Sequence, residues 1–340
     1  MTSIIRFLTL ALSLAALPAQ ADPVEDFYKG KRITLLIGFS SGGYDTYARL
    51  LAPYISKYIP GNPTIVPQNM PGASGLGAAN YLYTVAPKDG TTIAVVSKAA
   101  ATLPLLGGTG TEYKNGAEFN WIGSANQEMS VLVAWHNTGI KTIQDVMQKE
   151  LVVGADAPGA DTMSLYPNLA NQFAGTKLKI IYGYSGGNAL TLALERGEIS
   201  GRTWTWSTLK AEKGDWLKDG KLNVLMQYAM RRADDLPNVP TIAELAKNDK
   251  DKQVLELIFG PQVMARPFVT APGVPADRVK ALRDAFDKAV RDKDLLADAE
   301  KRKLEISPAS GTAVQAMVED AYKSPADVIK RALELVPLAN

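Results

Sequence analysis

The sequence pattern that most directly suggests covalent chemistry is GYSGG at residues 183–187, which has the G-x-S-x-G spacing of a serine nucleophile. It follows an apolar run and precedes a segment of helical period, as the nucleophile of α/β hydrolases does. The hydroxyl needs a general base, and in that fold the histidine follows the serine in the chain. The single histidine here, His136, precedes Ser185, so the sequence argues against hydrolysis.

Metal, nucleotide and nucleic-acid binding also lack sequence support. The chain has no cysteine and His136 has no second histidine beside it, so the usual ligands of a zinc site are missing. Neither a D-x-D-x-D-G calcium loop nor a G-x-x-x-x-G-K phosphate loop occurs. The formal net charge of +2 at pH 7 is too small to steer the chain toward nucleic acid. We therefore expect no catalytic residue, no metal, no cofactor and no nucleic-acid partner.

Loops of glycine, serine and other small residues recur at the ends of predicted strands. In open parallel sheets ligands bind at the carboxyl ends of strands, and free amides at helix N-termini suit an anionic group. Glycine lets the backbone approach such a group closely. Any one of these loops is an ordinary turn, but together they predict a cleft lined by amides and hydroxyls. The loops are residues 40–45, 69–75, 97–101, 155–162 and 184–188.

Three larger side chains near these loops are candidates for ligand contact. Arg202, in the segment GRTWTWS, has the charge to pair with a ligand carboxylate or with the nearby Glu198. Trp204 suits either core packing or ligand stacking. Tyr44 lies inside the first loop, and its small neighbours leave it little core to join, so we expect it to form a wall of the cleft.

Apolar runs rich in Ile, Val and Leu alternate with segments of helical period along the whole chain. This alternation predicts parallel sheets with crossover helices. After the first loop, Tyr47, Leu50 and Tyr54 repeat at helical spacing. Asp45 stands where an N-cap is expected, and PGNP at residues 60–63 would end the helix. Strands are expected at residues 33–37, 64–68, 92–96, 131–135, 151–154, 179–182, 222–228 and 262–265, and an amphipathic helix at 277–289.

Two segments share one plan, since residues 38–52 and 154–170 each follow a strand with a small-residue loop and open a helix with Asp-Thr. Residues 180–194 repeat the strand, loop and helix. These α/β units predict two domains that face each other. A crossing at residues 121–135 and a return at 259–272 would join them and let a cleft open and close.

The first residues have the features of a secretory signal peptide. A short basic start precedes the apolar run 7–17, and AQA at residues 19–21 fits a cleavage site. We expect residues 1–21 to be removed on export. The remaining chain has no run of eighteen apolar residues, so we predict no membrane-spanning helix.

Several motifs in order resemble one family, the periplasmic receptors of tripartite tricarboxylate transporters, also called Bug proteins. The resemblance rests on GGYD at 42–45, GNP at 61–63, QNMPGASG at 68–75 and PKDG at 87–90. It continues in YGYSGGNALTLALERGEISG from Tyr182 and APGVPADRVKALRDAF from Ala271.

The resemblance implies an α/β, type II-like periplasmic binding protein fold, with a mostly parallel sheet flanked by helices in each domain and the ligand cleft between them. Domain 1 would comprise residues 22–123 and 260–340, and domain 2 residues 124–259. The resemblance also implies a monomer in the periplasm of a Gram-negative bacterium. It would capture a small organic carboxylate and deliver it to large and small integral membrane subunits.

In such receptors backbone amides, short hydroxyl side chains and ordered waters hold the carboxylate, which implies loops 41–45 and 158–162 here. Asp161 departs from the family pattern, and it is tolerable if it caps the helix and points away from the ligand. The implied and derived ligand-binding residues are Ser41, Gly42, Gly43, Tyr44, Asp45, Asn69, Ser74, Ser97, Pro158, Gly159, Ala160, Asp161, Thr162, Ser185, Arg202 and Trp204.

Two alternatives keep the same cleft. An exported acyl hydrolase would use Ser185, and a carboxylate-sensing input protein would report to a signalling partner instead of a transporter. The sequence leaves open whether the ligand is a dicarboxylate, a tricarboxylate, an aromatic acid or an amino acid.

Overall fold

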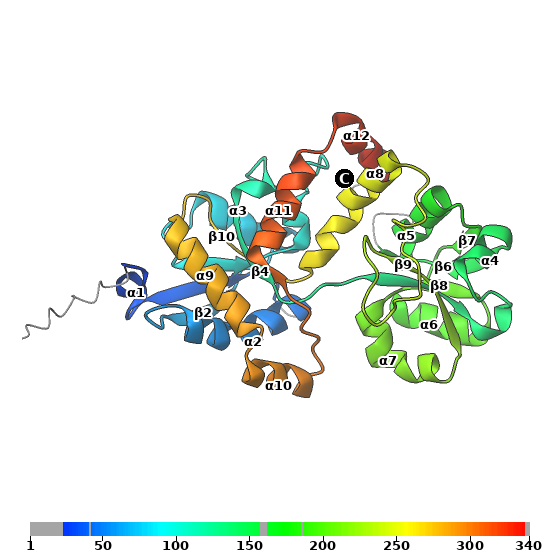
Figure 1. The fold of residues 1–340 in the computed structure, drawn as a ribbon, viewed down its shortest axis with the longest axis horizontal. Helices are drawn as coiled ribbons and strands as arrows, with labels where there is room; N and C mark the ends of the chain where they lie inside the picture. Colours follow the sequence, from blue (N-terminus) through cyan, green and yellow to red (C-terminus); the bar gives the residue numbers. More distant parts are fainter. Residues whose placement is uncertain (1–22, 41, 157–161, 185, 337–340) are drawn as a thin grey trace, which may run out of the picture.

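The computed structural model describes residues 23–40, 42–156, 162–184 and 186–336, with the side chain of Ser74 left out. The predicted signal peptide, residues 1–21, lies outside this part. The chain forms two sheets, each flanked by helices (Figure 1). We call each sheet with the helices packed on it the first half and the second half. No helix within the described residues has the length and apolar character needed to cross a membrane.

The first half is built on a sheet with the strand order β11-β4-β10-β3-β1-β2. Its strands run in one direction except β10 and β11. Ile33, Leu35 and Ile37 of β1 are buried in the core of this half. The strands are β1 (Arg32–Ile37), β2 (Thr64–Asn69), β3 (Thr92–Val95), β4 (Asn120–Ser124), β10 (Pro267–Thr270) and β11 (Ala309–Ser310).

The second half has the strand order β7-β6-β8-β5-β9. Here only β5, the strand that enters from the first half, runs against the others. The strands are β5 (Ser130–Trp135), β6 (Leu151–Gly154), β7 (Leu178–Ile181), β8 (Gly201–Thr205) and β9 (Leu222–Tyr228). In each sheet most strands run in one direction, but the sheets are mixed and not mostly parallel as predicted, because three of the five strand pairs in the first sheet and two of the four in the second are antiparallel.

Helices cover both sheets. Val279, Leu282 and Phe286 form the predicted apolar stripe of α9 and are buried. The helices are α1 (Pro23–Tyr28), α2 (Gly43–Tyr58), α3 (Leu76–Thr84), α4 (Ile143–Gln148), α5 (Thr162–Leu169), α6 (Gly187–Arg196), α7 (Trp206–Lys218), α8 (Asp249–Phe259), α9 (Ala276–Ala289), α10 (Lys293–Lys301), α11 (Gly311–Tyr322) and α12 (Ala326–Leu335). Shorter turns are η1 (Ala73–Gly75), η2 (Lys98–Ala101), η3 (Gly116–Glu118), η4 (His136–Thr138), η5 (Ala170–Ala174) and η6 (Gly260–Met264).

Two local predictions are wrong. Residues 262–265 form no strand, because they lie in and just after η6, and the strand of this region begins at Pro267. Asp45 is not the N-cap of α2, which begins at Gly43 with Gly42 as its cap. The Asp45 carboxylate instead accepts hydrogen bonds from Arg49 and Asn69, which compete with the helix amides for its oxygens.

Two neighbouring segments connect the halves, and we call them the hinge pair: residues 125–129 after β4, and residues 260–266 before β10. They hydrogen-bond to each other, with Glu128 N donating to Gln262 O at 3.0 Å and Ala265 N to Asn126 O at 3.1 Å. The chain crosses again near its end, since α11 packs on β4 whereas α12 packs on α8 (Figure 1). The domain boundaries stay a prediction.

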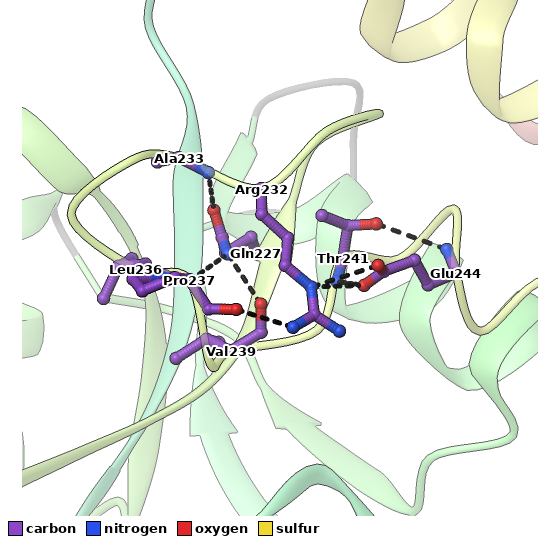
Figure 2. A network of polar contacts seen from close by, with 8 residues as sticks. All are labelled: Gln227, Arg232, Ala233, Leu236, Pro237, Val239, Thr241 and Glu244. Carbon is purple, nitrogen blue, oxygen red and sulfur yellow. Dashed lines mark hydrogen bonds and ion pairs between the residues drawn. The ribbon is translucent and has the colours of Figure 1, made fainter.

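The long loop that follows β9 is fastened to the second sheet by Gln227, whose side chain is fully buried. Its amide nitrogen donates to Leu236 O at 3.0 Å and Val239 O at 2.7 Å, and its oxygen accepts from Ala233 N at 2.8 Å. Arg232 closes the same loop by pairing with Glu244 at 3.0 Å (Figure 2).

Replacing Gln227 by leucine should lower the free energy of unfolding by about 3 kcal/mol, because two carbonyls and one amide lose their partner inside the protein. Urea denaturation followed by circular dichroism measures this change. Gln253→Leu, at an exposed position of α8, is the control and should change stability by less than about 0.5 kcal/mol. Equal midpoints for the two variants would contradict the bracing role of Gln227.

Candidate ligand-binding site

Two helices, one in each half, begin with the same backbone conformation. The N-cap of α2 is Gly42, with φ 84° and ψ −164°, and the N-cap of α6 is Gly186, with φ 83° and ψ −173°. A positive φ of this kind is available to glycine at little steric cost. Neither glycine provides a side-chain cap, so the first amides of both helices stay available to an anion.

A buried arginine lies beside the start of α6. Arg202, on β8, is 3% exposed. Its Nη1 donates to Gly187 O at 2.7 Å and to Thr191 Oγ1 at 2.8 Å. The guanidinium carbon lies 4.0 Å from the ring centroid of Trp204, which is itself buried. These contacts fix the guanidinium at the N-terminus of the helix.

This arginine lines a cavity of about 330 Å³ in the second half. The starts of two helices open into it, since Thr162 begins α5 and Asn188 lies in the first turn of α6. Hydroxyl and amide groups thus share the cavity wall with one guanidinium and one exposed carboxylate. The polar residues of the wall are Thr162, Asn188, Arg202, Thr203, Thr205, Thr208 and Glu212.

The charge of Arg202 has no close counter-ion among the described residues. Burial lowers the pKa of Arg202 to about 10, and the charge of Glu212, which lines the same cavity, opposes this shift although no ion pair joins the two side chains. The side chain is therefore charged at neutral pH. Glu198, the alternative partner considered from the sequence, lies 3.8 Å from Arg196 instead. A buried cation that borders a cavity without a carboxylate partner is suited to bind an anion.

In the first half, Asp45 and Asn69 bind each other. Asn69 Nδ2 donates to Asp45 Oδ1 and to Phe39 O, each at 2.7 Å. Arg49 donates to both side chains, at 3.0 Å to Asp45 and 2.6 Å to Asn69. The structure thus gives these two predicted ligand residues partners within the protein, and they hold the first loop against the start of α2.

Tyr44 is held between an aromatic ring and a cation. It stacks on Phe39 with ring centroids 4.0 Å apart, and the Arg266 guanidinium carbon lies 4.7 Å from its centroid. Its hydroxyl accepts from Lys98 N at 3.5 Å, and burial raises its pKa. The Ser97 hydroxyl accepts from Ala99 N as the cap of η2.

Sequence reasoning missed three charged residues in this half. Arg266 Nη1 lies 3.5 Å from Glu128 Oε2, and Lys98 Nζ lies 3.9 Å from the same carboxylate. The three residues come from the hinge pair and from η2, so only the fold brings them together. The available signal was the position of Arg266 within the predicted return segment 259–272, directly before Pro267.

Part of the predicted site lies outside the described residues: Ser41, Pro158, Gly159, Ala160, Asp161 and Ser185, with the side chain of Ser74. The second loop can thus be followed only at Thr162, where α5 begins. Within the described ranges, no group of three or more histidine and carboxylate residues is arranged to hold a metal ion.

A family model described as the receptor of the tripartite tricarboxylate transporter family, TctC, matches residues 47–333. The chain belongs to this family. This chain is also 30% identical over 308 residues to the UPF0065 protein in the gbd 5' region of Cupriavidus necator. The match covers 83% of this chain and 81% of that protein.

Several solved structures share the fold of this protein. A TctC solute-binding protein from Polaromonas, solved with no ligand, matches with a TM-score of 0.68 and 21% identity over 91% of this chain and 98% of the other. A protein of R. palustris solved with adipate matches with a TM-score of 0.56 and 21% identity over 91% and 99%. The two sheets described above thus have the fold of these solved solute-binding proteins.

Gly43 at the start of α2 and Gly187 at the start of α6 differ in the space available to a side chain, which allows a matched test of packing at the two sites. A Cβ built on Gly43 would lie 2.7 Å from Arg266 Nη2, whereas one on Gly187 would lie 3.5 Å from Arg202 Nη2. Gly43→Ala must therefore displace Arg266 and should destabilise the protein by about 1–2 kcal/mol. Gly187→Ala should be neutral or slightly stabilising. Urea midpoints measure both changes, and equal effects would contradict the tight packing of Arg266.

Proposed function

We propose that this protein is a periplasmic receptor that captures a small organic carboxylate between its two halves and delivers it to a tripartite tricarboxylate-type membrane transporter. The observation that carries the proposal is Arg202, a buried cation at the edge of a cavity, with no carboxylate partner among the described residues. Membership of the receptor family supports the same class of function.

The physical argument concerns the cost of a buried charge. An isolated ion loses its hydration when it is buried, and a paired, hydrogen-bonded ion recovers part of that loss. A ligand carboxylate beside Arg202 would supply the missing charge and accept from the guanidinium. The amides at the starts of α5 and α6 and the threonine hydroxyls of the cavity would complete its hydrogen bonds.

Closure of the cleft follows from how the halves are joined. The hinge pair lets the two sheets rotate toward each other while each core stays intact. We propose the division into residues 22–123 with 260–340, and residues 124–259, and expect a monomer. Loops 41–45 and 158–162, with Ser185, would meet across the closed cleft. The large and small membrane subunits would then receive the closed receptor.

We propose binding without catalysis and without a cofactor. The family model describes a receptor, and a serine at 185 would still need a general base that the sequence does not provide after it. An exported hydrolase at Ser185 therefore remains the weaker candidate. Two-domain neighbours include a protein solved with adipate and one solved with malate, which supports a carboxylate ligand for this chain.

A thermal-shift screen of the purified protein with small organic acids tests the ligand class. A carboxylate at a hundred times its dissociation constant should add about 2.7 kcal/mol to the free energy of unfolding. Arg202→Gln should abolish this shift. Because Arg202 also donates to Thr203 O, Gly187 O and Thr191 Oγ1, the change should lower the stability of the ligand-free protein by about 1–3 kcal/mol, and circular dichroism checks that the variant is folded. Arg196→Gln, which removes an exposed arginine from the same half, is the control and should keep the shift. A screen in which no carboxylate raises the melting temperature contradicts the proposal.

The transport role is tested in cells. Deletion of the gene should reduce uptake of the radiolabelled carboxylate found in the screen, and a copy encoding Arg202→Gln should not restore it. A copy encoding Ser185→Ala should restore uptake, because a receptor needs no nucleophile. Unchanged uptake in the deletion strain would instead favour a sensing protein with the same cleft.

A further inference from the structure

We propose that a segment of the first half, residues 302–308, holds the closed cleft together through an ion pair between Glu305 and Lys210 of the second half. We call this segment the strap. It leads from α10 to β11 along the side of the first half that faces the second half (Figure 1). The strap rests on one part of the proposed function, the closure of the two halves, and does not depend on which ligand is bound.

The strap is attached to the first half on both sides of Glu305. Lys303, with a left-handed φ of 56°, turns the chain away from the end of α10. Leu304 and Ile306 then pack against the core of the first half. Tyr47 of α2 donates its hydroxyl to Glu305 O at 2.8 Å. Because both neighbours of Glu305 pack on the core, its carboxylate is left at the surface, where it is 46% exposed.

This carboxylate meets the second half at α7. Glu305 Oε2 lies 3.7 Å from Lys210 Nζ. The ammonium group is held in place, since it donates to Asp235 Oδ2 at 2.8 Å, and the same oxygen accepts from Trp206 Nε1 at 2.9 Å. Lys210 Nζ also lies 5.3 Å from the ring centroid of Trp206. Glu305 is therefore the second carboxylate beside a cation whose position is fixed.

The strap also touches the hinge pair, because Gln127 N donates to Ser307 Oγ at 3.1 Å. One short segment thus contacts α2, the hinge pair and α7. Within the described ranges, the pair of Glu305 and Lys210 is the ion pair that joins α7 to the first half. The other charged contacts between the halves involve Glu128 of the hinge pair or join α8 to α12.

Closure should shorten this ion pair. At the spacing of the present structure the cavity beside Arg202 is lined by residues of the second half alone, so the first half must approach to cover a ligand. The hydroxyl of Tyr47 couples Glu305 to α2, and α7 forms part of the cavity wall through Thr208 and Glu212. As α2 approaches this wall, Glu305 moves toward Lys210, and the loss of water between the halves strengthens their attraction.

The size of the effect follows from the exposure of the two side chains. An ion pair at the surface contributes little, and one that belongs to a network of charges contributes more. We therefore expect removal of the pair to change the closed population about two- to fivefold. At about 1 M NaCl the Debye length is about 3 Å, so the difference should nearly vanish.

The first test needs no ligand. The chain has no cysteine, so spin labels can be attached at Leu296→Cys in α10 and Leu192→Cys in α6, both at exposed positions. Double electron–electron resonance measures the distance between the labels. Glu305→Gln should shift the distribution toward longer distances at about 50 mM NaCl and leave it like that of the wild type at about 1 M. Identical distributions at low salt would overturn the proposal.

The second test measures ligand release. Stopped-flow tryptophan fluorescence follows dissociation of the carboxylate found in the thermal-shift screen. Glu305→Gln should release it about two- to fivefold faster than the wild type. Lys210→Gln should also accelerate release, and adding Glu305→Gln to it should have no further effect, because the pair is already broken. Additive effects of the two changes, or a wild-type rate for Glu305→Gln, would reject the role of the strap.

The matched control is Glu195→Gln. Glu195 pairs with another lysine of α7, Lys213, at 3.1 Å, but both residues belong to the second half. This change should alter neither the label distance nor the rate of release. If Glu305→Gln does not fold, as judged by circular dichroism, Lys210→Gln removes the same pair from the other side and decides. Absence of binding by every carboxylate would reject the proposed function, whereas the label distances would still decide whether the strap joins the halves.

Discussion

The positive charge of Arg202, buried under the start of α6, is the constraint on which the arrangement of the second half depends. The guanidinium is held by Gly187 O, Thr191 and the face of Trp204, and none of these neutralises it. Such a charge persists only where the surrounding core is firm enough to support it. In the same sheet, Gln227 ties the long loop to β9.

Each half places a cation beside a helix start, but the cation comes from a different element in each. Each needs a helix start whose amides are free, a glycine with positive φ before it, and a cation close by. In the second half β8 supplies the cation directly, whereas in the first half the cation comes from the hinge pair. Arg266 therefore lies in the hinge pair and also packs beside the start of α2, and Glu128 of the same pair contacts both Arg266 and Lys98.

Local patterns predicted seven of the strands to within one residue at each end, because apolar runs bounded by small residues leave few alternatives, but they missed β4, β8, β10 and β11. The run at 262–265 was misleading, since GPQVMA is apolar enough for a strand but Pro261 and the turn η6 bend it. Asp45 was misread as a cap because the sequence does not reveal that Arg49 and Asn69 reach its carboxylate. Arg202 was found through its neighbours in sequence. Arg266 was missed because its contacts, Gly43 and Tyr44, lie in a distant part of the chain.

The third passage of the chain between the halves changes how the cleft can move. The hinge pair alone would act as a simple axis and permit both bending and twisting. The short turn between α11 and α12, with α12 seated on α8 away from the hinge pair (Figure 1), adds a tether at a second point. Such a tether removes rotational freedom, so the first and second halves should approach each other along one fixed path.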